Sequence, residues 1–98
     1  MVFEIIPSKI FLEQLDDLSD EAKELIEKKI EILELNPSHF KRITGYGLFL
    51  FRIRFENMRK EKRLVYLIDG SKVILLCILD RNKEYKDLEN YLKRSDLI

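Results

Sequence analysis

Two segments near the middle of the chain alternate apolar and charged side chains in the way that paired β-strands do. In residues 48–56, phenylalanine and isoleucine occupy one set of alternate positions, and Arg52 and Arg54 fall in the other set. In residues 62–68, Arg63 precedes a second apolar run. Successive side chains of a strand point to opposite faces, so a hairpin would place three guanidinium groups on one face and the aromatic rings on the other. Because like charges this close repel one another, their gathering favours a polyanionic ligand.

Helical patterns precede these strands, and a third apolar strand and another helical pattern follow them. Runs of helices beside runs of strands predict an α+β fold, and the short links make the last three strands antiparallel. We therefore expect an N-terminal strand, a helical hairpin, a three-stranded antiparallel meander and a C-terminal helix, with residues 39–46 as a connecting loop. The expected elements are a strand at about 1–6, helices capped by Ser8 and Ser19, strands at about 48–56, 62–68 and 72–80, and a helix at about 83–95.

The helical hairpin is expected to cover the aromatic face of the sheet, including Phe49 and Phe51. The opposite face would then be basic at one end and apolar elsewhere, and an exposed apolar surface of this kind is usually covered by a partner. By alternation this face carries Arg52, Arg54, Arg63, Val65 and Leu67, with Cys77 and Leu79 nearby.

Length and composition are those of a single domain spanning residues 1–98. The hydrophobic fraction of 46% suffices for a core. The lone Cys77 lies in an apolar strand pattern and is expected to be a small core residue. No cofactor and no metal are expected, because no Cys/His cluster has ligand spacing and no glycine loop could cradle phosphate. With no signal-peptide pattern and no apolar run approaching the roughly 20 residues of a membrane span, we expect a cytoplasmic protein with no membrane partner.

The formal net charge of zero conceals an uneven distribution along the chain. Residues 1–40 hold ten acidic and four basic residues, a net charge of −6, and residues 41–98 carry the compensating +6. Most of the positive excess lies in residues 41–63. A dipolar distribution of this kind is compatible with nucleic-acid binding, which a neutral total by itself would argue against.

Three local motifs resemble the RelE/ParE superfamily of toxins from bacterial and archaeal toxin–antitoxin pairs. FRIRF (51–55) and KRLVY (62–66) resemble the family's basic strand and its Arg-[LV]-[VI]-Tyr strand, and LDRNKEY (79–85) resembles its late arginine followed by a tyrosine. The resemblance extends to the element order over nearly all of the chain. It implies a RelE-like fold.

The RNA-cleaving branch of that family enters the ribosomal A site and cuts messenger RNA, and a small antitoxin wraps the toxin. By resemblance, Arg52 and Arg54 take the places of the strand's two basic residues, and Arg63 that of the arginine that stabilises the reacting phosphate. Arg81 takes the place of the late arginine and Tyr85 that of the C-terminal tyrosine. The implied partners are a cognate antitoxin, the ribosome and messenger RNA. Four guanidinium groups would then converge on one uncovered patch that binds a chain of phosphates.

The chemistry requires no metal, because the 2′-hydroxyl of RNA can itself attack the adjacent phosphorus. Arginine suits charge neutralisation, since its planar fork matches pairs of phosphate oxygens. However, the active branch often has lysines where this chain has Arg52 and Arg54, and a guanidinium cannot act as a general base. The link 56–62 also looks slightly longer than in compact relatives. The remaining proton-transfer candidates are Tyr85, Lys83, Glu84 and a shifted Lys60 or Lys62.

Each of these residues also has a purely structural interpretation. Arg52 and Arg54 could be edge charges that prevent aggregation of sheets, and Arg63 could pair with Glu56 or Glu61. Arg81 could simply end a strand, and Tyr85 could be the first core residue of the last helix.

Two other functions remain open at this level. One is inhibition by binding without cleavage, as in the ParE branch that poisons DNA gyrase. The other is a degenerate binding module that kept the fold and lost the activity.

Overall fold

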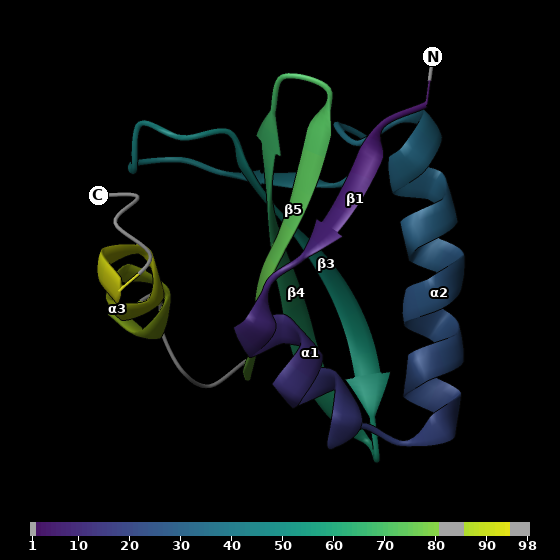
Figure 1. The fold of residues 1–98 in the computed structure, drawn as a ribbon. Coiled ribbons are helices and arrows are strands. Elements are labelled where there is room, and N and C mark those ends of the chain that lie inside the picture. Colours follow the sequence, from purple (N-terminus) through teal and green to yellow (C-terminus); the bar gives the residue numbers. More distant parts are fainter. Residues whose placement is uncertain (1, 81–85, 95–98) are drawn as a thin grey trace.

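The computed structural model describes residues 2–80 and 86–94, which form one five-stranded sheet and three helices (Figure 1). The strand order is β1-β5-β4-β3-β2. Strands β3, β4 and β5 form the expected antiparallel meander, and β1 pairs with β5 in parallel. The predicted α+β class is confirmed. The elements are β1 (Glu4–Pro7), α1 (Lys9–Asp16), α2 (Asp20–Leu35), β2 (Lys41–Ile43), β3 (Leu50–Asn57), β4 (Lys60–Asp69), β5 (Lys72–Asp80) and α3 (Lys86–Arg94).

Both helices of the N-terminal hairpin begin at the serines that the sequence indicates. The hydroxyl of Ser8 accepts a hydrogen bond from the backbone N–H of Phe11, and that of Ser19 accepts one from Ala22. Each bond satisfies a backbone donor that the first turn leaves without a partner. The side-chain oxygen of Asn57, at the end of β3, accepts from the Ser19 backbone N–H at 2.9 Å. This bond joins the start of α2 to the tip of the β3–β4 hairpin.

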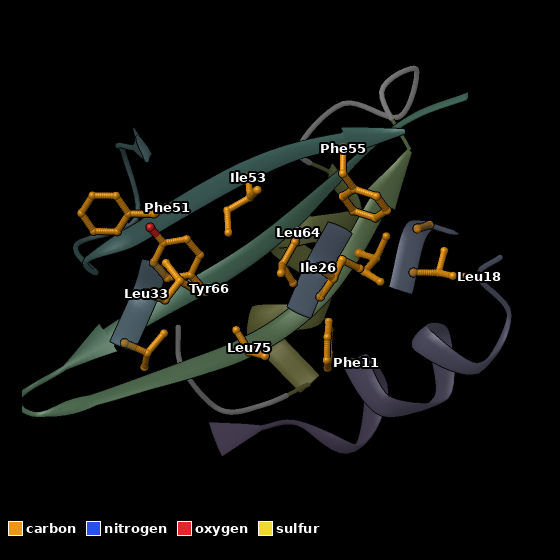
Figure 2. Close-up of a cluster of buried hydrophobic side chains, with 13 residues drawn as sticks. Phe11, Leu18, Ile26, Leu33, Phe51, Ile53, Phe55, Leu64, Tyr66 and Leu75 are labelled. Atoms are coloured by element: carbon orange, nitrogen blue, oxygen red, sulfur yellow. The ribbon is translucent and has the colours of Figure 1, made fainter. Parts of the chain in front are cut away.

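Helices α1 and α2 cover one face of the sheet (Figure 1), and the aromatic side chains of that face are buried in the cluster drawn in Figure 2. Tyr66 is fully buried there, its ring stacked on Phe51 with centroids 5.4 Å apart, and its hydroxyl donates to the carbonyl of Pro37 at 2.5 Å. Tyrosine in the KRLVY segment is therefore a core residue. The buried members of this layer are Phe11, Leu18, Ala22, Ile26, Leu33, Phe51, Ile53, Phe55, Leu64, Tyr66, Val73, Leu75 and Ile78.

The buried hydroxyl of Tyr66 makes stability depend on alkaline pH. Burial raises its pKa well above the ordinary value of 10.0. Above pH 10 the unfolded chain releases this proton while the folded chain retains it, so the group's contribution to stability is present below pH 10 and is lost as the pH rises. The free energy of unfolding should fall by up to about 1.4 kcal/mol per pH unit from this group. Denaturant titrations between pH 9 and 11 should show a shallower fall for Tyr66→Phe than for the wild type; parallel curves would contradict the assignment.

The sequence led us to expect an exposed second face of the sheet, but in the structure this face is covered. Helix α3 lies on it, opposite α2 (Figure 1), and buries Leu88 and Leu92 against the apolar part of the face. These two leucines are four residues apart and so lie on one side of the helix. That apolar side needs a surface, and the first face is already occupied by α1 and α2. The sheet residues buried in this second layer are Ile43, Leu50, Val65, Leu67, Leu76, Cys77 and Leu79.

Strand β2 and the position of Phe49 were not anticipated. Residues 39–46 were expected to form a loop, but Lys41–Ile43 pairs with β3. A strand of three residues with one buried side chain is too short to show an alternation of apolar and polar residues in the sequence. Phe49 precedes β3 and is 59% exposed, with the Arg42 guanidinium 4.7 Å from its ring centroid, so it does not join the aromatic face.

The link between β3 and β4 is a two-residue turn, shorter than the segment that the sequence indicated. Asn57 pairs with Lys60, and Met58 and Arg59 between them have φ of 51° and 66°. Positive φ at both central positions is what a type I′ hairpin turn requires, and Asn-Gly is the usual sequence there. A Met-Arg pair lacks that signal, so the turn could not be recognised from its residues.

Relieving this turn should stabilise the protein. The double variant Met58→Asn with Arg59→Gly is expected to raise the free energy of unfolding by about 1 kcal/mol, because left-handed backbone at ordinary residues costs about 1–3 kcal/mol each and glycine returns part of that gain to the unfolded chain. The melting temperature should rise by about 4–8 °C. The control Met58→Ala keeps the strain and loses little contact, since Met58 is 78% exposed; an equal rise in that variant would show that strain is not the cause.

Candidate nucleic-acid interface

The register between β3 and β4 places Arg54 directly opposite Arg63. Residues that face each other across an antiparallel pair have Cβ atoms about 4.5–5.5 Å apart and point to the same side of the sheet. That side is the second face, opposite the aromatic core. Arg54 is exposed and Arg63 is half-buried. We call the surface formed by Arg54, Arg63 and the exposed Lys41 the basic face.

Within the described residues, neither arginine of this pair forms an ion pair with a carboxylate. The ion pair between Lys62 and Asp80, with Nζ and Oδ1 2.6 Å apart, involves neither arginine. The Nε atom of Arg63 is buried and has no hydrogen-bond partner among the described residues. A buried unsatisfied donor costs about 1–3 kcal/mol, and two opposed cations add repulsion. Folding alone gives no reason for such an arrangement, whereas an anion held between the two guanidinium groups would offset both costs.

Arg52 lies on the same side of the sheet as Arg54 but is only 8% exposed. It was expected on an open patch, and its burial corrects that expectation. Strand β2 begins at Lys41, which pairs with Arg52. Arg52 therefore has a strand on each side, whereas Arg54 lies beyond the end of β2. Lys41 is the basic residue that sequence reasoning missed on this face, because the three-residue strand that carries it gives no recognisable pattern.

Two carboxylates form the next row on this side of the sheet. Glu56 faces Glu61 across the hairpin, two residue pairs beyond Arg54 and Arg63. Alternation puts all four side chains on the same side. Each glutamate is thus diagonal to an arginine of the other strand. The row of like charges at Arg54 and Arg63 is followed by a row of opposite charge.

Arg81 and Tyr85 lie outside the residues that the structure describes. Their predicted roles at the phosphate remain predictions. Of the five site residues indicated by the sequence, the structure brings Arg54 and Arg63 together on an accessible surface and places Arg52 beside them in a buried position.

Solved structures of RelE toxins have the same architecture. A mutant of the E. coli toxin RelE in the free state matches with a TM-score of 0.76 at 17% identity, over 96% of this chain and 98% of that one. The archaeal RelE-RelB complex from Pyrococcus horikoshii OT3 matches with a TM-score of 0.64 at 19% identity, over 85% of this chain and 99% of that one. The chain has a RelE-like fold.

The RelE-like fold is also found in the intact E. coli RelBE toxin-antitoxin complex, which matches with a TM-score of 0.65 at 17% identity, over 83% of this chain and 99% of that one. No protein-family model and no curated protein matches the sequence. The likeness thus rests on the course of the backbone. It confirms the RelE-like fold that the sequence motifs implied.

A polar cavity of about 250 Å³ lies at one end of the sheet. Gln14 of α1 forms part of its wall and takes the place of a neighbouring strand: its amide donates to the carbonyl of Ile78 at 2.9 Å and accepts from the Ile78 N–H at 2.6 Å. The same amide donates to the hydroxyl of Tyr91 at 3.2 Å. Gln14 therefore joins α1, β5 and α3. A glutamine on a helix surface gives no sequence signal of this role.

Two further properties concern the described part of the chain. Its helices lack the length and apolarity needed to cross a lipid bilayer. Within the same residues, no three His, Cys, Asp or Glu side chains come together as a metal site would need.

Proposed function

We propose that this chain is the toxin of a toxin–antitoxin pair, and that it is a ribosome-dependent endoribonuclease that cuts messenger RNA and so inhibits translation. Residues 1–98 would form the single toxin domain. The observation that carries the proposal is the pair of opposed arginines, Arg54 and Arg63, neither of which forms an ion pair among the described residues. The RelE-like fold supports it, because proteins with this fold include a toxin in the free state and toxins in complex with an antitoxin.

The arginine pair suits the charge that develops when RNA cleaves itself. As the 2′-oxygen attacks, negative charge builds on the oxygens around phosphorus. Two guanidinium forks can each offer paired N–H donors to those oxygens, and such preorganised donors contribute most in partly buried sites. Lys41 extends the positive surface along the sheet, where it can contact a neighbouring phosphate and help order the strand.

The proposed antitoxin would cover the same surface. Because α3 already occupies the apolar part of this face, the part left for a partner is the basic one. We infer that the antitoxin contributes acidic side chains opposite Arg54 and Arg63, and that bound antitoxin blocks access of messenger RNA.

The test is expression of the chain in cells without its antitoxin, followed by mapping of messenger RNA 5′ ends. Cuts clustered within translated codons are expected. A reconstituted reaction with purified protein and ribosomes carrying a synthetic message should give the same cuts, and a message with a 2′-deoxy nucleotide at the cut site should resist cleavage. Intact messages with damaged chromosomes would instead indicate a gyrase inhibitor, and no effect on growth would indicate an inactive module.

A further inference from the structure

The cleavage proposed above needs a group that takes the proton from the attacking 2′-hydroxyl. The arginines of the basic face stay protonated and cannot do this. Residues 83–85, which include three of the candidates from the sequence, lie outside the described residues. Lys62 is bound to Asp80 and, like Lys60, alternates with Arg63 onto the opposite side of the sheet. Within the described chain, none of these candidates lies on the basic face.

A carboxylate is present where the base is needed. Glu56 follows Arg54 by two residues on β3, which places the two Cα atoms about 7 Å apart on the same side of the strand. It is diagonal to Arg63 across the hairpin, at about 7–8 Å. Glu56 is exposed and forms no ion pair with any residue that the structure describes. It can therefore reach a ligand bound to the two arginines.

We propose that the carboxylate of Glu56 is the general base of this cleavage, an inference that rests on the proposed function. With the scissile phosphate held by Arg54 and Arg63, Glu56 accepts the proton of the 2′-hydroxyl. The 2′-oxygen bonds to phosphorus while the bond from phosphorus to the 5′-oxygen breaks, and that oxygen takes a proton from water. The products are a 2′,3′-cyclic phosphate and a 5′-hydroxyl.

Position distinguishes Glu56 from its neighbour Glu61. Glu61 lies on the inner strand β4 and is half-buried, whereas Glu56 lies on β3 beyond the last residue that pairs with β2. Among the described strands, this part of β3 is an open edge of the sheet. An RNA strand that crosses the arginines can approach Glu56 from that edge. In a reactive geometry the 2′-oxygen lies within about 3–3.5 Å of phosphorus, so the carboxylate needs to reach only slightly beyond the bound phosphate.

The competing explanation is electrostatic. Two opposed glutamates repel each other, and their diagonal arginines could screen that repulsion in a purely structural cluster. In that case, neutralising Glu56 would change stability or the binding of RNA and leave the chemical step unaffected. A catalytic base predicts the reverse, so the two explanations can be separated by measuring the chemical step alone.

The experiment compares wild type and Glu56→Gln in single-turnover cleavage of a message on ribosomes. Glutamine keeps the shape and removes the proton acceptor, so the maximal rate should fall by about 10²–10⁴-fold. The protein concentration that gives half the maximal rate, and the melting temperature, should stay unchanged. A message whose scissile 5′-oxygen is replaced by sulfur should show the same defect, because a thiolate leaves without protonation. Disappearance of the defect with that message would assign Glu56 to the leaving group and overturn the proposal.

The matched control is Glu61→Gln, which removes the opposing carboxylate and should cut at nearly the wild-type rate. A large loss in E61Q with a normal rate in E56Q would overturn the assignment. If the rate loss in E56Q arises from weaker ribosome binding, the assignment of Glu56 as the base is also overturned, and Glu56 belongs to a purely structural cluster of charges. If wild type cuts and E56Q cuts equally fast, this inference alone fails. If wild type does not cut at all, the proposed function fails with it.

Discussion

Replacing Arg63 by alanine should lower messenger RNA cleavage by about 10²–10³-fold, the usual effect of removing one preorganised donor to a developing negative charge. The reason lies in the sheet register, which places Arg63 opposite Arg54, so that both could contact the phosphate of the proposed substrate. The free energy of unfolding should change little or rise slightly. The substitution removes a repulsion between two cations and a buried Nε donor without a partner among the described residues. Single-turnover cleavage and thermal unfolding of the same preparations measure both effects.

The control for this prediction is Arg42→Ala. Arg42 lies on β2 next to Lys41, so strand alternation turns it away from the basic face, and it contacts the exposed ring of Phe49. Loss of one positive charge at that position should leave the cleavage rate nearly unchanged. If Arg63→Ala instead unfolds the protein, Arg63 serves the fold. If Arg42→Ala and Arg63→Ala lose activity equally, only the overall positive charge matters.

Replacing Leu64 by alanine should have the opposite effect to Arg63→Ala: a large loss of stability and little change in the cleavage rate. Leu64 follows Arg63 in sequence but points into the aromatic core, opposite Ile53, with no exposed surface. Truncating a fully buried leucine removes apolar contacts and leaves a cavity, at a cost of about 2–5 kcal/mol. The melting temperature should fall by about 8 °C or more, since each kcal/mol corresponds to about 4–8 °C in a domain of this size. Denaturant unfolding checks the free energy directly.

At temperatures where Leu64→Ala remains folded, it should cut messenger RNA at nearly the wild-type rate. The arginines are held by the backbone of β3 and β4, and the side chain lost from position 64 lies on the other side of the sheet. The milder variant Leu64→Met conserves volume and should cost less than about 1.5 kcal/mol. A strong loss of cleavage in fully folded Leu64→Ala would mean that core packing sets the arginine geometry, and that the two faces are not independent.

Much of the fold could be predicted because its signals are local. Ser8 and Ser19 cap the two helices as expected, and the alternation in 48–56 and 62–68 assigns Arg54 and Arg63 to one side of the sheet. These features depend on residues a few positions apart. Strand β2 and the Met58-Arg59 turn escaped prediction because the first is too short to alternate and the second lacks the usual turn residues.

The candidate site was only partly predictable for a different reason. Whether a side chain is exposed to solvent depends on which segment, distant in the sequence, packs beside it. Arg52 and Arg54 look equivalent in sequence, but Arg52 lies between β2 and β4 and is 8% exposed, whereas Arg54 lies beyond the end of β2 and is exposed. Glu56 looked like a possible structural partner of Arg63, and the register makes it an exposed neighbour of both arginines. The roles assigned to Arg81 and Tyr85 stay predictions, since both lie outside the described residues.

By itself, the sequence determined the order of helices and strands apart from β2, and the side of the sheet to which Arg52, Arg54 and Arg63 belong, because helix caps and strand alternation are properties of neighbouring residues. The tertiary structure decided which of those charges can meet a ligand. It did so through the pairing of β2 with β3 and the packing of α3 across the second face, which are contacts between segments far apart in the chain.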